Sequence, residues 1–272
     1  MSKLYVVGTP IGNLSDMSPR AVETLSEVDF IAAEDTRVTM KLLNHFNIKK
    51  PMVSYYEHNK RERGEIICER ILAGESCAIV TDAGMPCISD PGEDLIKLCE
   101  QKGIPTFVVP GPSAVISALA VSGLDTGRFC FEGFLSVNKK SRKEHLELLK
   151  NESRTMIFYE APHKLPTTLR DLYGFFGERK LSIVREITKI HEEVIRTTTK
   201  YAAEELADSG IKGEIVLVLE GKQTEDKEEY TLEQAVELAK KLIDEGSKLG
   251  DAAKEAASVT GFKKNEIYKE LV

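Results

Sequence analysis

The chain has 272 residues, 42% hydrophobic and 30% charged, with a formal net charge of −7. This length favours two domains or one domain with appendages, and no apolar run approaches the roughly 20 residues that a membrane helix needs. The acidic balance argues against nonspecific nucleic-acid binding by bulk electrostatics, although a local basic site remains possible. Five cysteines without a C-x-x-C pair and five histidines without H-E-x-x-H predict neither a disulfide framework nor a metal site.

The first half of the sequence repeats a short apolar strand followed by an amphipathic helix. The first such helix is expected after Ser18, which suits an N-cap, with Pro19 at the first helical position. The five strands are expected at Lys3–Val7, Phe30–Ala33, Met52–Tyr56, Ala78–Val80 and Thr106–Val109. Five strand–helix units predict a parallel sheet. The run Lys3–Val7 is too short for the apolar part of a signal peptide, so a cytoplasmic protein is expected.

The turn after the first strand carries neither G-x-G-x-x-G nor G-x-x-x-x-G-K-[ST]. The sequence therefore argues against a dinucleotide-binding enzyme and against a P-loop enzyme. The longest strand-to-helix loop instead follows the fourth strand and runs from Thr81 to Gly92. Its two prolines reduce the entropy lost on ordering, which suits a preformed ligand site at the carboxyl end of a parallel strand. The alternative is a plain turn in which Asp90 caps a helix that begins at Pro91.

Polar residues also follow other strands of this sheet. Glu34–Arg37 follows the second strand and either forms a polar site or caps the next helix through Asp35 or Thr36. Glu57–Asn59 follows the third strand, and Ser113 and Ala114 begin a helix after the fifth. The backbone N–H groups of that helix start could meet a ligand or only end the strand.

The pattern breaks at Ser122–Gly127, where a linker is expected. Beyond it the expected strands are Phe129–Leu135, Thr155–Tyr159, Leu181–Glu186, Glu193–Thr198 and Glu214–Leu219. The expected helices are Lys143–Leu149, Lys164–Phe176 and Tyr201–Ala207. The third and fourth of these strands leave no room for a crossover helix, so they should be antiparallel neighbours in a mixed sheet.

A charged segment, Gln223–Tyr230, predicts a second linker. Short helices follow, and a glycine turn at Thr260–Gly261 gives them a helix-turn-helix character. The last helix mixes lysines with glutamates, so a packing or RNA-contacting appendage is favoured over a DNA reader. The predicted organisation is an α/β domain at 1–122, a second α/β domain at 123–222 and a helical appendage at 230–272.

Taken together, the motifs resemble the tetrapyrrole methylase superfamily and, within it, the ribosomal small-subunit methyltransferase I family. The matching segments run in order along almost the whole chain: Val7–Leu14, Ala33–Arg37, Tyr56–Asn59, Thr81–Pro86, Ser89–Gly92, Pro110–Ala114, Tyr159–Lys164 and Lys212–Glu214. Corrin and porphyrin methylases typically have Gly-Asp-Pro after the fourth strand, whereas this chain has Asp82-Ala83-Gly84. That departure favours the ribosomal branch.

The resemblance implies S-adenosylmethionine bound between two α/β domains, a homodimer, and 2′-O-methylation of a decoding-site cytidine of 16S rRNA. The assembled small subunit, not naked RNA, is the expected substrate. Carried over by matching position, the cofactor-binding residues would be Asp82, Gly84, Ile88, Ser113, Ala114, Tyr159, Ala161, Gly213 and Glu214. The expected catalytic candidates, chosen because they end strands, are Asp35, Arg37, His58, Glu160 and Arg185. Arg37 could instead bind an RNA phosphate.

A basic run provides the expected RNA contact through Lys139, Lys140, Arg142 and Lys143. Two other classes of function fit parts of the sequence. A tetrapyrrole methyltransferase would share the cofactor site but needs a wide apolar substrate trough. A ligand-sensing helix-turn-helix regulator would bind duplex DNA with strong salt dependence and transfer no methyl group.

Overall fold

A computed structural model describes residues 2–223 and 230–272. It divides the chain into two compact units, Met1–Gly221 and Lys222–Val272, and both sheets belong to the first. The expected linker at 223–230 falls mostly on residues 224–229, outside the described residues. Within the described ranges, no helix is long and apolar enough to cross a membrane.

The first sheet is parallel, as predicted, with strand order β3-β2-β4-β1-β5. Its strands are β1 (Leu4–Val7), β2 (Phe30–Ala33), β3 (Met52–Ser54), β4 (Cys77–Val80) and β5 (Thr106–Val109). The helices between them are α1 (Pro19–Glu27), α2 (Thr36–His45), α3 (Lys60–Leu72) and α4 (Glu93–Gln101), with a 3-10 turn at Leu14–Asp16. Ser18 caps α1 through its side chain, with Pro19 first in the helix.

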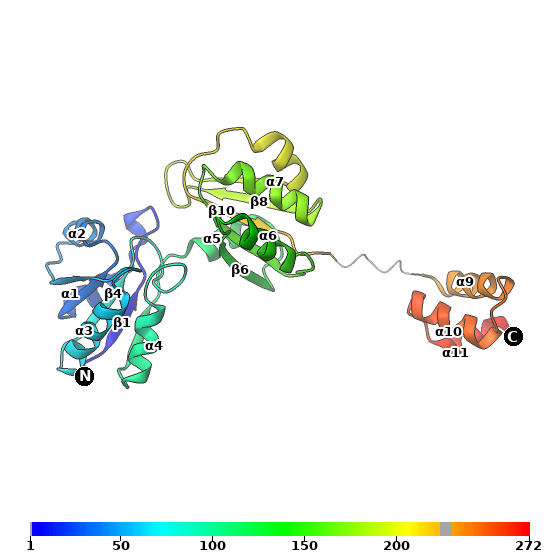
Figure 1. Cartoon of the computed structure of the whole chain (residues 1–272), viewed down its shortest axis with the longest axis horizontal. Helices are drawn as coiled ribbons and strands as arrows, with labels where there is room; N and C mark the ends of the chain where they lie inside the picture. The colour runs from blue at the N-terminus through cyan, green and yellow to red at the C-terminus, as the bar shows by residue number, and fades with distance from the viewer. Residues whose placement is uncertain (1, 224–229) are drawn as a thin grey trace. The chain divides into compact units, whose positions relative to one another are not determined.

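Successive side chains along each strand point to opposite faces of this sheet. Helices cover both faces (Figure 1). Leu4 and Ile79 pack with α3 and α4 on one face, whereas Val7 and Val80 pack with α1 and α2 on the other. The neighbouring strands β1 and β4 therefore continue into helices on opposite faces. Such a reversal opens a crevice at the carboxyl ends of the two strands, which is where ligands bind in open α/β sheets.

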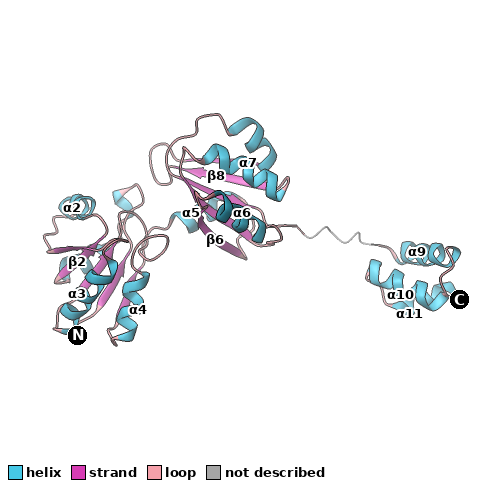
Figure 2. Ribbon diagram, viewed as in Figure 1, coloured by secondary structure: helices cyan, strands magenta, loops and turns pink. Residues whose placement is uncertain are grey.

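The second sheet is mixed, with order β6-β7-β10-β8-β9, and is drawn as a separate layer of strands in Figure 2. Its strands are β6 (Phe129–Phe134), β7 (Thr155–Glu160), β8 (Lys180–Arg185), β9 (Glu193–Thr198) and β10 (Ile215–Leu219). The strands β8 and β9 are antiparallel neighbours, which confirms the expectation from their short connection. The last strand, β10, lies in the middle of the sheet, between β7 and β8.

Helices cover both faces of the second sheet. One face packs on α6 (Lys139–Leu148), α7 (Leu165–Phe176) and the helical turns at Thr199–Leu206. The other face packs on α5 (Ala114–Ser122), although α5 follows the last strand of the first sheet. The helix α5 thus joins the two halves of this unit, and it ends at Gly123, whose left-handed backbone suits glycine.

The second unit contains α9 (Leu232–Asp244), α10 (Leu249–Thr260) and α11 (Lys264–Leu271). These helices share a small core of alanines with Val236 and Ile267. A capping box between Thr231 and Gln234 starts α9.

Several expected boundaries are wrong, and three of them have a clear physical reason. The strand β3 ends at Ser54, because Tyr56 begins a turn closed by the Asn59 side chain. The helix α6 begins at Lys139, four residues early, because Asn138 caps it. The helix α4 begins at Glu93 rather than Pro91, and Gly92 is its N-cap, so Asp90 does not cap it.

Candidate functional site

A cavity of about 400 Å³ lies where loops of the first sheet meet the second sheet. Three parts of the fold contribute to its walls. They are the loops after β1, β4 and β5, the turns after β7 and before β10, and Phe134 at the end of β6. The lining residues are Ile11, Ala83, Gly84, Met85, Ile88, Ser89, Asp90, Ser113, Ala114, Phe134, Tyr159, Glu160, Ala161, Pro162, Ile187, Gly213, Glu214, Ile215 and Val216. Neither sheet alone could build this site.

The loops after β1 and β5 lie in direct contact. A Cβ on Gly8 would lie 2.7 Å from the Cα of Gly111, and a Cβ on Gly111 would lie 2.8 Å from the Cα of Gly8. Only two glycines allow this approach. It places the start of α5, with Ser113 and Ala114, beside the β1 loop at the cavity wall.

The loop after β4 is fixed by backbone bonds and by unusual backbone angles. Thr9 and Gly84 exchange two backbone hydrogen bonds, of 2.9 and 3.1 Å. Cys87 and Ser89 have positive φ values of 71° and 64°, and Gly92 has 139°. Non-glycine residues rarely occupy this region, and such strain is concentrated at functional sites. The loop that the sequence singled out is thus a rigid cavity wall.

The opposite wall depends on Glu186, which follows β8. One of its carboxylate oxygens accepts the Glu214 backbone N–H at 2.9 Å and lies 3.0 Å from the Lys189 ammonium. Lys189 also pairs with Glu214 at 3.2 Å. Gly213, at φ +95°, packs so closely that a Cβ there would lie 2.4 Å from the Glu186 carboxylate. This network holds the 213–214 turn against the cavity.

Asp90 is the half-buried carboxylate of the cavity, and no hydrogen bond to it is seen among the described residues. Burial and the nearby charges of Glu34 and Asp82 raise the pKa of Asp90 to about 6. Across the cavity, burial and the Asp90 charge raise the pKa of Tyr159 to about 12. Asp90 can therefore change protonation near neutral pH, which suits an acid–base or hydrogen-bonding role.

Acidic side chains at the ends of β2 and β4 bind the neighbouring strand. The Asp35 N–H donates to Asp82 at 3.2 Å, and the Asp82 N–H donates to Glu34 at 3.5 Å. Burial raises the pKa of both Glu34 and Asp82. The charge of Asp82 raises the pKa of Glu34 further. By contrast, hydrogen bonds from Arg37 lower the pKa of Asp35 to about 2.

Eight of the nine expected cofactor residues line the cavity: Gly84, Ile88, Ser113, Ala114, Tyr159, Ala161, Gly213 and Glu214. Asp82 does not; it lines a neighbouring cavity beside Thr81. The sequence reasoning missed Asp90, Ile11 and Ile187. Asp90 stood in one of the family-like segments, Ser89–Gly92, so a signal for it existed, whereas nothing in the pattern marked Ile187.

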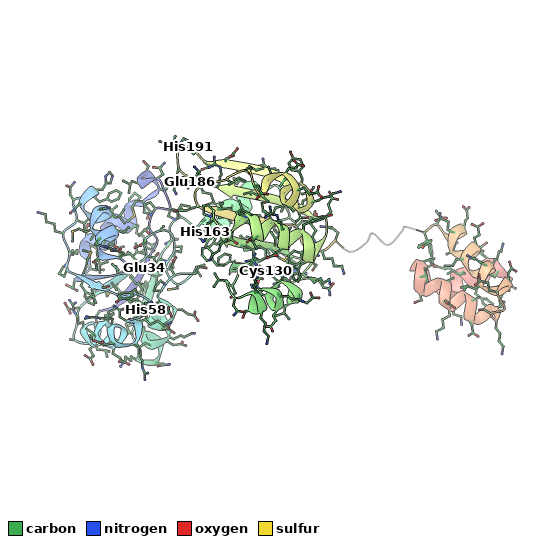
Figure 3. The ribbon with its side chains drawn as sticks, turned by 45° about the horizontal axis from the view of Figure 1, so that its top comes forward. Glu34, His58, Cys130, His163, Glu186 and His191 are labelled. Atoms are coloured by element: carbon green, nitrogen blue, oxygen red, sulfur yellow. The ribbon has the colours of Figure 1, made fainter. Side chains whose placement is uncertain are left out.

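The expected catalytic candidates lie in different places. Asp35 and Arg37 form an exposed ion pair whose side chains are 26% and 87% exposed. His58 is exposed at the end of the first sheet and stacks edge-on near Tyr56 (Figure 3). Glu160 lines the cavity but is almost fully buried, and its two oxygens accept from the Ala161 N–H and the Thr168 hydroxyl.

Arg185 lies away from the cavity. Its guanidinium pairs with Glu193 at 2.7 Å and donates to the Lys212 carbonyl at 3.1 Å. In the basic run, Lys139, Lys140 and Lys143 are exposed. Arg142 is instead held inside the unit, 2.6 Å from Asp171 and 2.8 Å from Thr168.

The fold is that of a tetrapyrrole methylase. The sequence pattern of the tetrapyrrole (corrin/porphyrin) methylases matches residues 3–203. Solved structures agree at the level of fold. A uroporphyrin-III-C-methyltransferase from Thermus thermophilus superposes with a TM-score of 0.58 at 17% identity, covering 81% of this chain and 94% of that chain. A diphthine synthase gives 0.60 at 15% identity, covering 81% and 90%.

Curated relatives are much closer in sequence. "Ribosomal RNA small subunit methyltransferase I" of Synechocystis sp. is 45% identical over 99% of this chain and 97% of its own length. The protein of the same name from Haemophilus influenzae is 44% identical over 98% and 95%. The one from Thermotoga maritima is 48% identical over all of its own length but only 82% of this chain. The chain belongs to the ribosomal RNA small subunit methyltransferase I family.

The cavity suits the donor that this class of methyltransferase uses, S-adenosylmethionine. Ligand pockets commonly measure roughly 300–1,000 Å³, and this one measures about 400 Å³. Several of the lining residues are small, namely Gly84, Ser113, Ala114, Ala161 and Gly213. Much of the remaining lining is apolar, including Ile11, Ile88 and Ile187.

Proposed function

We propose that the protein transfers a methyl group from S-adenosylmethionine to the ribose 2′-hydroxyl of a decoding-site cytidine, cytidine 1402 of 16S rRNA. The assembled small ribosomal subunit is the proposed substrate, and the cytoplasm the proposed location. The observation that carries the proposal is the cavity shared by the two sheets, with eight of the residues expected for the donor in its wall. The names of the close relatives support the class of substrate.

Bound in this cavity, S-adenosylmethionine would supply an electrophilic methyl group on a sulfonium. The work of the chain is then to align the ribose hydroxyl with that methyl group and to exclude water. The rigid 81–92 loop and the 213–214 turn hold the two walls in register. A hydrogen-bond acceptor at the hydroxyl contributes about 10²–10⁴-fold.

Among the side chains that line the cavity, Asp90 is the best suited to accept that proton. It lines the cavity without a described partner, and its pKa of about 6 lies near the working pH. Asp35 is bound to Arg37 and has a pKa of about 2, which makes it a weak base. Asp35, Arg37, His58, Glu160 and Arg185 remain proposed contributors. For Arg37 we favour an RNA phosphate, and for Glu160 the fixing of the turn after β7.

The test is single-turnover methylation of small subunits with labelled donor, with donor affinity measured separately by calorimetry. Asp90→Asn should lower the rate by about 10²-fold or more and leave donor affinity within a few-fold. Asp35→Ala and His58→Ala report on the other candidates. Wild-type protein that binds no donor, or that labels a tetrapyrrole precursor and not subunits, would overturn the proposed function.

We further propose that Lys139, Lys140 and Lys143 contact RNA, because their side chains are exposed. Arg142 is left out of this proposed contact because it is paired with Asp171. Charge reversal at the three lysines should raise the KM for subunits without changing donor affinity.

The homodimer is also a proposal. It is supported by the edge strand β5, where Phe107 and Val108 are each about half exposed, and sedimentation equilibrium tests it.

A further inference from the structure

A second cavity, of about 260 Å³, lies beside the first. It is bounded by the β1 loop, the β4 loop and the first half of α2, and its lining residues are Thr9, Pro10, Gly12, Leu14, Val38, Thr39, Lys41, Leu42, Thr81 and Asp82. None of these residues lines the first cavity. The proposed function does not account for this space.

The two cavities share a wall. That wall consists of the segments 9–14 and 81–84, which are joined by the two backbone hydrogen bonds between Thr9 and Gly84. Ile11 and Gly84 line the first cavity, whereas Gly12 and Asp82 line the second. A molecule that occupied the second cavity would therefore lie one chain thickness from the donor site.

The lining combines apolar surface with unused hydrogen-bonding groups. Leu14 and Val38 are 42% and 37% exposed. The hydroxyls of Thr39 and Thr81 are buried and have no hydrogen-bond partner among the described residues. A threonine in a helix has two accessible χ1 positions, so the Thr39 hydroxyl can turn toward a ligand. Buried polar groups are normally paired, so unpaired ones beside a cavity point to a polar ligand.

We infer that the second cavity receives the heterocyclic base of the target nucleotide. The inference rests on the proposed function. Enzymes that do chemistry on a base turn the target nucleotide out of its stack into a pocket that reads it by hydrogen bonds and by contact with apolar or aromatic side chains, and we apply the same geometry to this ribose methyltransferase. With the base between Leu14 and Val38, the ribose would lie at the shared wall, where its 2′-hydroxyl can face the donor cavity.

The charge around this cavity fits the same nucleotide. The guanidinium of Arg37 is 87% exposed and pairs with Asp35. Its hydrogen bond to Asp35 and the charges of Asp35 and Asp82 raise the pKa of Arg37. Lys41 is in the lining itself. Cations at the rim suit the phosphates that flank the base, whereas the interior has the two hydroxyls for the edge of the base.

The decisive variant fills the cavity without touching the donor site. Val38→Phe should lower kcat/KM for small subunits by about tenfold or more, the scale of a mismatched pocket, with the affinity for S-adenosylhomocysteine within twofold of wild type. The matched control is Met40→Phe, because Met40 is an exposed apolar residue of the same helix that does not line the cavity. The control should behave as wild type.

Removing the hydroxyls gives an independent readout. Thr39→Val and Thr81→Val should narrow the preference for cytidine over uridine at the target position, measured on subunits that carry either base. Thr24→Val, a buried threonine of α1, should leave that preference unchanged.

The inference is overturned if Val38→Phe methylates subunits as the control does, or if it loses donor affinity in parallel with activity. A thermal unfolding scan identifies a misfolded variant, in which case the base preference of Thr39→Val decides. Wild-type protein that labels no subunits would refute the proposed function, and this inference with it. An active wild type with an active Val38→Phe variant refutes this inference alone.

Discussion

At the scale of single residues, two aspartates of the first sheet have pKa values shifted in opposite directions. Burial raises the pKa of Asp90 to about 6, whereas Arg37 lowers the pKa of Asp35 to about 2. The folded protein therefore binds a proton at Asp90 more tightly than the unfolded chain does. Ionisation of Asp90 opposes folding, and this cost grows as the pH rises from about 4 to about 6.

We predict that Asp90→Asn stabilises the protein above about pH 7, by up to about 2 kcal/mol after allowance for solvent screening. At about pH 4 the difference should vanish, because Asp90 is then protonated in the wild type. Urea unfolding at a series of pH values measures this. The same variant should lose methylation, since groups that serve function are often held at a cost in stability.

Asp35→Asn is the natural comparison, because its effect has the opposite sign. The lowered pKa of Asp35 contributes stability above the unfolded pKa, near 4, and that contribution is lost as the pH falls toward 2. Asp35→Asn should therefore be destabilising at neutral pH. A stabilising effect of both variants, or of neither, would contradict the assignment of charges at this edge of the sheet.

At the scale of elements, the turn before β10 depends on a glycine for two separate reasons. Gly213 has a positive φ, and a Cβ there would collide with the Glu186 carboxylate that holds the Glu214 N–H. Gly210 also has a positive φ, but a Cβ there would meet open space. A comparison of substitutions at Gly213 and at Gly210 therefore separates the effect of backbone strain from the effect of displacing Glu186.

We predict that Gly213→Ala weakens binding of S-adenosylhomocysteine at least about tenfold, while Gly210→Ala leaves it within twofold. Both should lose about 1–2 kcal/mol of stability from the left-handed backbone. Calorimetric titration and thermal unfolding on the two variants provide the comparison. Equal losses of affinity would show that the Glu186 contact does not shape the cavity.

Elements with a regular spacing of apolar residues and a recognisable capping residue could be predicted from the sequence. The parallel sheet followed from repeated strand–helix units, and Ser18-Pro19 marked α1 correctly. The start of α4 was wrong because Asp90-Pro91 looks like a cap, while the backbone angle of Gly92 moves the first turn onward. The start of α6 was missed because its first turn is entirely polar and shows no apolar period.

Much of the candidate site was also predictable, because ligands bind where parallel strands end and these ends are marked by glycine, proline and acids. The contribution of Ile187 was not, since it depends on how the second sheet packs against the first. The unpaired Asp90 carboxylate likewise follows from burial by distant residues. Such contacts exist only after the halves meet.

At the scale of the whole molecule, the helical unit at Lys222–Val272 has its own core. The Thermotoga maritima relative matches over its full length while leaving 18% of this chain unmatched, a share close to that of this unit. We therefore predict that a protein ending at residue 223 folds and binds donor as the full chain does. Calorimetry and single-turnover methylation on the shortened protein test this.

Retained binding with a raised KM for subunits would assign the helical unit to RNA contact. Lost donor binding would contradict the independence of the two units. Thr231→Ala, which breaks the capping box, should destabilise the helical unit by about 1 kcal/mol and leave donor affinity intact.

The placement of β10 has a consequence for biosynthesis. The strand at the middle of the second sheet is the last of that sheet to be translated, and in the folded protein the strands on either side of it pair with it and not with each other. The apolar side of α5 packs on the same sheet. The second sheet can therefore be completed only after residue 219 has been synthesised, and until then β7 and β8 lack the central strand that each of them pairs with.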